Sequence, residues 1–105
     1  MEYIPYTYLI GWTNLDRWYY GVQYKETGKK ANPSNLWTNY HTSSKNVAYY
    51  REEYGEPDVI EVRKIFTNGT PKERRKASQL YEKRVLQSLV KDLDHFENDK
   101  RQLLQ

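Results

Sequence analysis

Apolar and polar residues alternate in two stretches near the start of the chain, residues 6–12 and 17–24, and both stretches are rich in aromatic side chains. Such alternation is typical of strands with one buried face. Residues 13–17 are mostly polar and predict a turn between the strands. The result would be a hairpin that places Tyr8 and Tyr19 on neighbouring strands.

The middle of the chain changes to helical spacing after a polar loop at residues 25–32. Asn32, which precedes a proline, resembles a helix cap, and apolar residues up to Tyr40 follow at helical spacing. The serine pair at positions 43–44 predicts a second cap, for a helix that ends at Gly55. We therefore expect two consecutive helices here.

Partial alternation in residues 58–66 predicts a third strand, which an Asn-Gly turn follows. Thr70 then begins a capping box, with a proline next and Glu73 as the third residue, and we expect this helix to run to about Val90. The order strand, strand, helix, helix, strand, helix predicts an α+β fold, in which a small three-stranded mixed β-sheet is flanked by helices.

The length of 105 residues predicts a single domain, residues 1–105, with a short charged C-terminal tail from about residue 91. A net charge of +3 and a pI of about 9.0 permit a nucleic-acid partner without requiring one. The absence of cysteine excludes disulfides, thiolate metal sites and cysteine nucleophiles. Without a signal peptide or a long apolar run, we expect a cytoplasmic protein that does not bind membranes.

One carboxylate is predicted to face the core. On a helical wheel of the last helix, Glu82 falls between Leu86 and Leu89, inside the apolar arc. An ionised carboxylate facing a core is costly unless it is paired or bound to a metal. A site with one carboxylate and several waters suits Mg²⁺. Alternatively, Glu82 bends out to solvent or pairs with a nearby basic residue, and the pattern leaves both options open.

The hairpin tyrosines and a group of basic residues are further candidates. The hydroxyls of Tyr8 and Tyr19 could converge on one point, and a phenol can donate, accept or lose a proton. The alternative is a cross-strand aromatic pair that only supports the sheet. His41, Lys45 and Arg51 fall within the middle helices, where they could hold phosphate oxygens or simply be solvated.

Together these motifs resemble the GIY-YIG nuclease family over residues 6–98. The triplet Tyr6-Thr7-Tyr8 corresponds to the first signature triplet and Tyr19-Tyr20-Gly21 to the second. Residues 36–45 and 51–58 are similar to small phage-type homing or nicking members. The resemblance implies a metal-dependent endonuclease that hydrolyses phosphodiester bonds of double-stranded DNA, with Mg²⁺ or Mn²⁺ as cofactor.

The resemblance also implies roles for individual residues. Tyr8 and Tyr19 match the signature tyrosines, Glu82 matches the single metal-ligating glutamate, and Asn98 matches a late asparagine. One Mg²⁺ on Glu82 would polarise the phosphate and hold the leaving oxygen. Tyr8 or Tyr19 would accept the proton of the attacking water, with a pKa that neighbouring cations lower from about 10.

The chain departs from the family pattern at the positions of the first helix that usually carry basic residues. The family's first helix usually carries an arginine and, four residues later, a histidine. Residues 36 and 40, or 37 and 41 with a shift of one, take these positions here, and neither pair contains arginine. The first triplet likewise has Tyr-Thr in place of Gly-Ile. We expect Lys45 or Arg51 to supply the charge, with His41 as a further phosphate contact.

Basic surfaces are expected to grip DNA phosphates, which positions the protein but reads little sequence. We expect a compact homing or nicking enzyme, or a weakly specific nuclease, that acts as a monomer or transient dimer on DNA in a bacterial host's cytoplasm. The alternatives are a catalytically inert DNA-binding module with the same fold and a protein-interaction domain that uses the tyrosine surface. The expected DNA-binding residues are Lys25, Lys29, Lys30, Arg74, Arg75 and Lys76.

Overall fold

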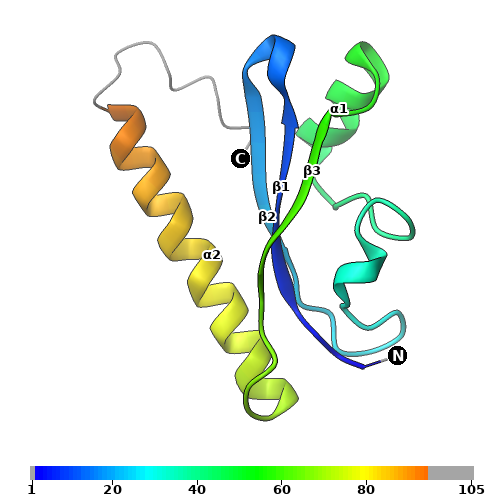
Figure 1. Cartoon of the computed structure of the whole chain (residues 1–105), viewed down its shortest axis with the longest axis vertical. Helices are drawn as coiled ribbons and strands as arrows, with labels where there is room; N and C mark the ends of the chain where they lie inside the picture. The colour runs from blue at the N-terminus through cyan, green and yellow to red at the C-terminus, as the bar shows by residue number, and fades with distance from the viewer. Residues whose placement is uncertain (1, 95–105) are drawn as a thin grey trace.

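A three-stranded antiparallel sheet forms the centre of the computed structural model, which describes residues 2–94 (Figure 1). Its strands are β1 (Tyr6–Trp12), β2 (Arg17–Gln23) and β3 (Val59–Ile65), and their order is β2-β1-β3. The predicted α+β fold with a three-stranded sheet and flanking helices is confirmed. The predicted mixed sheet is wrong, because both neighbours of β1 run antiparallel to it.

The segment between β2 and β3 contains one α-helix where two were predicted. α1 (Lys45–Tyr54) begins at the predicted cap, since the Ser44 side chain accepts a hydrogen bond from a backbone amide in the first turn. The other predicted helix is only a 3-10 turn, η2 (Pro33–Asn35). It ends there because Leu36 is extended and Trp37 adopts a left-handed φ of 60°.

α2 (Pro71–Asp94) lies on the other side of the sheet from α1 and η2 (Figure 1). It begins at the predicted capping box: the amide of Thr70 donates to the Glu73 carboxylate at 3.1 Å, and the amide of Glu73 donates to the Thr70 hydroxyl at 3.2 Å. The helix continues past Val90, into the stretch where we expected a tail. None of the helices in the described part of the chain is long and apolar enough to cross a membrane.

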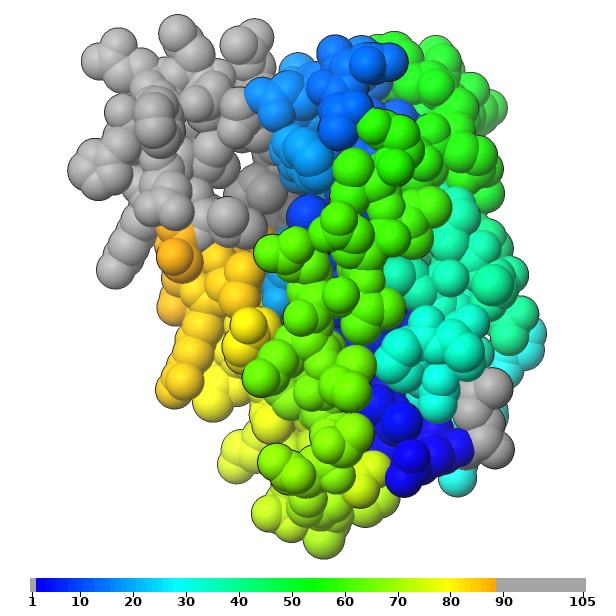
Figure 2. Space-filling view, viewed as in Figure 1, coloured from blue at the N-terminus to red at the C-terminus, as the bar shows by residue number. Residues whose placement is uncertain are grey.

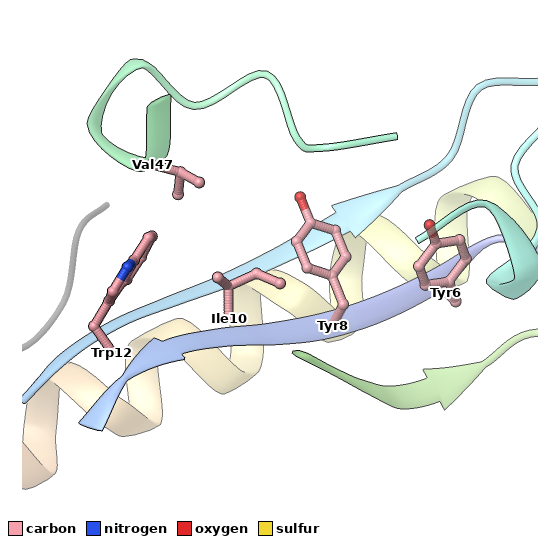
Figure 3. Packing of buried hydrophobic residues seen from close by; sticks show 5 residues of the cluster. All are labelled: Tyr6, Tyr8, Ile10, Trp12 and Val47. Atoms are coloured by element: carbon pink, nitrogen blue, oxygen red, sulfur yellow. The ribbon is translucent and has the colours of Figure 1, made fainter. Parts of the chain in front are cut away.

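The core is built on one face of β1. The side chains of Tyr6, Tyr8, Ile10 and Trp12 all project from the same side of the strand, and Val47 of α1 joins them in one buried cluster (Figure 3). All five are buried. Alternation along a strand places every second residue on one face, which is why the aromatic positions of the first stretch share this core. Much of the molecule's apolar burial therefore comes from tyrosine and tryptophan.

The segment that follows α1 forms hydrogen bonds with the tip of the hairpin. The carbonyl oxygen of Gly55 accepts a hydrogen bond from the Trp12 indole at 2.9 Å. Asp58 accepts hydrogen bonds from both the backbone amide of Thr13, at 2.9 Å, and the Thr13 hydroxyl. The Gly-Glu-Pro-Asp run, one of the motifs behind the family resemblance, thus has a structural role in this chain.

β3 is an edge strand and lies at the surface of the molecule, where it crosses the front face in Figure 2. The apolar side chains of Ile60, Val62 and Ile65 are 39%, 41% and 49% exposed. The buried hydrophobic cluster is formed by β1 and α1, and β3 contributes nothing to it. The buried core is therefore built on the hairpin, and the third strand lies largely outside it.

Candidate functional site

Three phenol rings converge above the hairpin. The hydroxyl oxygens of Tyr8 and Tyr40 lie 3.2 Å apart, so that one donates a hydrogen bond to the other, and their rings meet edge to face at 5.8 Å. The ring of Tyr19 lies 6.1 Å from that of Tyr8. The structure therefore brings the two signature tyrosines together. It adds Tyr40, whose spacing predicts a helical residue and which lies outside the helices of the structure.

Gly21 creates the room for these rings. It lies directly opposite Tyr8 in the β1–β2 ladder. A Cβ atom at this position would lie 2.6 Å from the Tyr8 hydroxyl oxygen and 2.7 Å from a ring carbon of Tyr19. Both distances are far below van der Waals contact, so the glycine of the second triplet is required by the packing of the two tyrosines.

Thr42 completes the cluster from a strained backbone. Its φ is 63°, a left-handed value that a β-branched residue rarely adopts. Its hydroxyl accepts a hydrogen bond from the amide of Ser44 at 3.4 Å, and it lies close enough to the phenols of Tyr8 and Tyr40 to lower the pKa of both in part. Strain of this kind costs about 1–3 kcal/mol and is often found at functional sites.

The electrostatics of the cluster correct one prediction. Burial strongly raises the pKa of Tyr8, and the neighbouring Tyr40 and Tyr19 raise it further, while the hydrogen bond with Thr42 opposes the rise only in part. No cation of the described chain contributes to this balance. The expected lowering of the Tyr8 pKa is therefore wrong, and Tyr8 is a protonated hydrogen-bond donor. Tyr19, which is only partly buried, is the remaining candidate for the base.

Glu82 lies on the inward side of α2, one turn after the fully buried Ser78. Its side chain is half-buried, and it forms no ion pair or hydrogen bond with any described residue. Burial raises the pKa of its carboxyl group. Burial also raises the pKa of Tyr40, and the charge of Glu82 adds to that rise. The charge of Glu82 also adds to the raised pKa of Tyr20, which lies outside the cluster, so Tyr40 is the phenol of the cluster that Glu82 lies near.

A half-buried carboxylate without a partner among residues 2–94 fits a cation ligand. Within the described chain, no group of three or more His, Cys, Asp or Glu side chains is placed to hold a metal ion. Glu82 could thus contribute one oxygen to an ion that keeps most of its waters, which is the coordination that Mg²⁺ favours. The donor set fits Mg²⁺ or Mn²⁺ better than zinc, which takes several nitrogen or sulfur ligands.

Two of the predicted cationic residues gather around an indole and not around the phenols. The guanidinium of Arg51 lies 5.0 Å from the centre of the Trp37 ring and donates to the Glu56 carboxylate at 3.0 Å. The ring of His41 packs edge to face on the same indole at 5.1 Å. Lys45 lies exposed in the first turn of α1 and is the candidate least committed to other contacts.

The predicted DNA-binding residues fall into two groups. Arg74 donates to the carbonyl oxygen of Tyr3 at 2.9 Å and to that of Gly69 at 3.1 Å, so it anchors α2. Arg75 lies 4.9 Å from the centre of the Tyr24 ring and near a glutamate. The exposed lysines of the predicted set are Lys25, Lys29, Lys30 and Lys76.

Asn98, the last predicted site residue, lies outside the described residues. Comparison with known proteins gives no relative: no family model, no curated protein and no solved structure matches the chain.

Proposed function

We propose that this protein is a metal-dependent endonuclease that hydrolyses DNA phosphodiester bonds. The observation that carries the proposal is the convergence of the Tyr8, Tyr19 and Tyr40 rings. Glu82 supports it, as a half-buried carboxylate without a partner in the described chain whose charge acts on Tyr40. Hydroxyl donors beside a lone carboxylate match the needs of phosphodiester hydrolysis, in which negative charge must be stabilised and a water activated.

The phenols supply neutral hydrogen bonds in this proposal. Burial keeps Tyr8 and Tyr40 protonated, so the buried Tyr8 can donate to the Tyr40 oxygen while the partly buried Tyr40 donates its own proton to a phosphate oxygen. Tyr19 is only partly buried and would take the proton from the attacking water. A divalent cation, when bound, would neutralise charge on the phosphate, and Glu82 would hold it there.

We assign the contact with the DNA backbone at this site to Lys45. It is exposed and follows Ser44, whose amide bonds to the Thr42 hydroxyl of the cluster. A mobile ammonium group at this position could contact a phosphate as a point charge. Lys45 would then replace the arginine that the family usually carries, because Arg51 is already engaged by Glu56.

The proposed enzyme cuts one strand at a time. A single site of this kind can attack one phosphodiester bond, so a double-strand break requires a second copy or a reorientation on the DNA. We therefore propose a compact nicking or homing endonuclease, acting as a monomer or a transient dimer in the cytoplasm of a bacterial host.

Plasmid cleavage tests this proposal. Supercoiled plasmid is incubated with the protein in Mg²⁺, in Mn²⁺ or in EDTA, and the topological forms are separated on a gel. We expect nicked circles before linear product, with either metal and not in EDTA. Intact supercoiled plasmid in all three conditions, with a protein that is folded by circular dichroism, would contradict the proposal.

A catalytically inert DNA-binding module is the second candidate. The observation in its favour is that no cation of the described chain acts on the pKa of Tyr8 or Tyr40. Exposed lysines would still bind phosphates, with an affinity that falls steeply as salt rises. Salt-sensitive plasmid binding together with no cleavage in Mg²⁺ or Mn²⁺ would select this candidate over the nuclease.

A further inference from the structure

A pocket of about 390 Å³ lies next to the phenol cluster, between the end of β2 and the segment around η2. Tyr40 lines this pocket and also bonds to Tyr8, so the pocket and the candidate site share one wall. Its volume falls in the range of about 300–1,000 Å³ that is common for small-molecule sites.

Carboxamide groups line the inner part of this pocket. Gln23 is only 6% exposed, and its carbonyl oxygen has no hydrogen-bond partner in the described chain. Asn35 is 4% exposed and donates to the carbonyl oxygen of Lys30 at 3.0 Å. Asn39 is exposed and donates to the side-chain oxygen of Asn35. Two of the three amides are thus built into the fold, and one of these has an unused acceptor.

A second buried polar atom without a partner belongs to the strand residue that pairs with Gln23. Tyr6 lies directly opposite Gln23 in the β1–β2 ladder, and its fully buried hydroxyl also has no partner within the described residues. Folded proteins pair nearly all of their buried polar atoms, so the unpaired oxygen of Gln23, a residue that lines the pocket, requires an explanation. A ligand with its own donors, or a water that the ligand displaces, would supply the missing partner of Gln23.

The entrance of the pocket is basic. Lys25 and Lys29 belong to the exposed loop after β2, and both line the pocket. Tyr24 and Tyr40 add aromatic surface to its walls. Cations at the mouth, aromatic walls and amides inside match the three parts of a nucleotide. The phosphate would meet the lysines, the base would contact the rings, and its polar edge would meet the amides.

We infer that this pocket binds one unpaired nucleotide of the DNA strand beside the scissile phosphate and reads its base through Gln23 and Asn39. This inference rests on the proposed function, because the shared residue Tyr40 places the pocket next to the reacting phosphate. The base must leave its stack to enter a pocket, which costs less in single-stranded or mismatched DNA. The protein would then prefer such sites, and the amides would select among bases.

Nucleotide binding tests the inference without any cleavage. The four deoxynucleoside 5′-monophosphates and inorganic phosphate are titrated into the ¹⁵N-labelled protein, and the side-chain amide signals are followed by NMR. We expect one or two of the nucleotides to shift the Gln23 and Asn39 signals and to bind at least about tenfold more tightly than phosphate. Equal effects of all four nucleotides and phosphate would overturn the inference in favour of a simple anion site, and so would no shift at either amide.

Substitution separates a binding amide from a structural one. Gln23→Leu removes the unpaired acceptor at similar volume, so we expect equal or higher thermal stability together with about tenfold weaker nucleotide binding. Asn39→Ala, at an exposed position, should weaken binding without unfolding the protein, and Lys72→Ala on α2 serves as the control. Unchanged nucleotide binding in both Gln23→Leu and Asn39→Ala would overturn the inference. A protein that binds nucleotides but never cuts DNA would overturn only the proposed function.

Discussion

The hydroxyl of Tyr8, on the central strand, lies 3.2 Å from the hydroxyl of Tyr40, which is 32 residues further along the chain. The contact joins a strand to a loop segment and closes the side of the hairpin that faces α1. Since burial keeps both phenols protonated, the pair is a source of hydrogen bonds and not of a phenolate base.

This hydroxyl pair predicts coupled losses of activity. Tyr8→Phe and Tyr40→Phe should each lower the rate of plasmid nicking by about 10²–10³-fold, as loss of a transition-state donor commonly does. The double variant should lose little more than the worse single variant, because the hydroxyls act as one unit. Each single change should cost only about 1 kcal/mol in the free energy of unfolding.

Nicking rates and thermal melts of the four proteins measure this coupling. Tyr49→Phe is the matched control, because Tyr49 is 54% exposed and lies on α1. Strictly additive losses, or equal losses in the control, would show that the pair does not act as one unit.

Glu82 predicts a stability that depends on pH and on metal. Because burial raises the pKa of its carboxyl group, the folded state binds the proton more tightly than the unfolded state. The free energy of unfolding should therefore fall as pH rises from the unfolded pKa through the folded one, and the loss should persist at neutral pH. Glu82→Gln should remove this pH dependence and raise the melting temperature at neutral pH relative to the parent.

A metal ion bound to Glu82 should raise the free energy of unfolding, which the ionised carboxylate alone lowers. A divalent cation that binds only the folded parent at ten times its Kd should add about 1.4 kcal/mol of stability. Melting curves with and without Mg²⁺ should separate for the parent and coincide for Glu82→Gln. A parent that shows no metal effect, or a variant that shows the full effect, argues against Glu82 as a ligand.

Gly21 predicts a steric penalty at the centre of the site. In Gly21→Ala the new methyl group would meet both Tyr8 and Tyr19 at less than 3 Å, so we expect a loss of up to about 3 kcal/mol and a site with displaced phenols. Gly28→Ala is the comparison. Gly28 has a positive φ, of 67°, but a Cβ atom there would lie 3.7 Å from its nearest neighbour, the Nζ atom of Lys25. It should cost about 1 kcal/mol. Equal melting temperatures for the two variants would contradict the crowding at Gly21.

Lys45 and Arg51 should respond differently to alanine. Lys45→Ala should weaken DNA binding and reduce the slope of log affinity against log salt by about 1, as expected for one lost phosphate contact. Arg51→Ala should leave that slope unchanged and lower stability by less than about 1 kcal/mol, because its ion pair with Glu56 is partly exposed. Binding titrations at several salt concentrations distinguish the two, and the reverse pattern would assign the phosphate contact to Arg51.

Local patterns in the sequence were enough to predict the elements that depend on near neighbours. The first stretch matches β1 residue for residue, and the Thr70 capping box and the Ser44 cap are both formed. Each depends on alternation or on a hydrogen bond within one turn, so residues that are close together in the sequence determine it. The inward orientation of Glu82 also follows from helical spacing alone.

The rest depended on contacts that the local pattern does not contain. The helix predicted after Asn32 fails because Trp37 adopts a left-handed φ, and nothing in an apolar spacing indicates which residue will do so. Tyr40 then leaves the predicted helix and reaches Tyr8, a contact that only the folded chain creates. The pKa of Tyr8 was predicted in the wrong direction because its burial was not foreseen.

The most direct test of the account compares the rate of a single DNA cut in the parent and in Glu82→Gln. Single-turnover nicking of supercoiled plasmid in Mg²⁺ is measured for both, with Glu52→Gln on the exposed side of α1 as the control. The account predicts a loss of at least about 10³-fold for Glu82→Gln, with the folded state intact by melting, and no change for the control. Equal nicking rates for the parent and Glu82→Gln would contradict it.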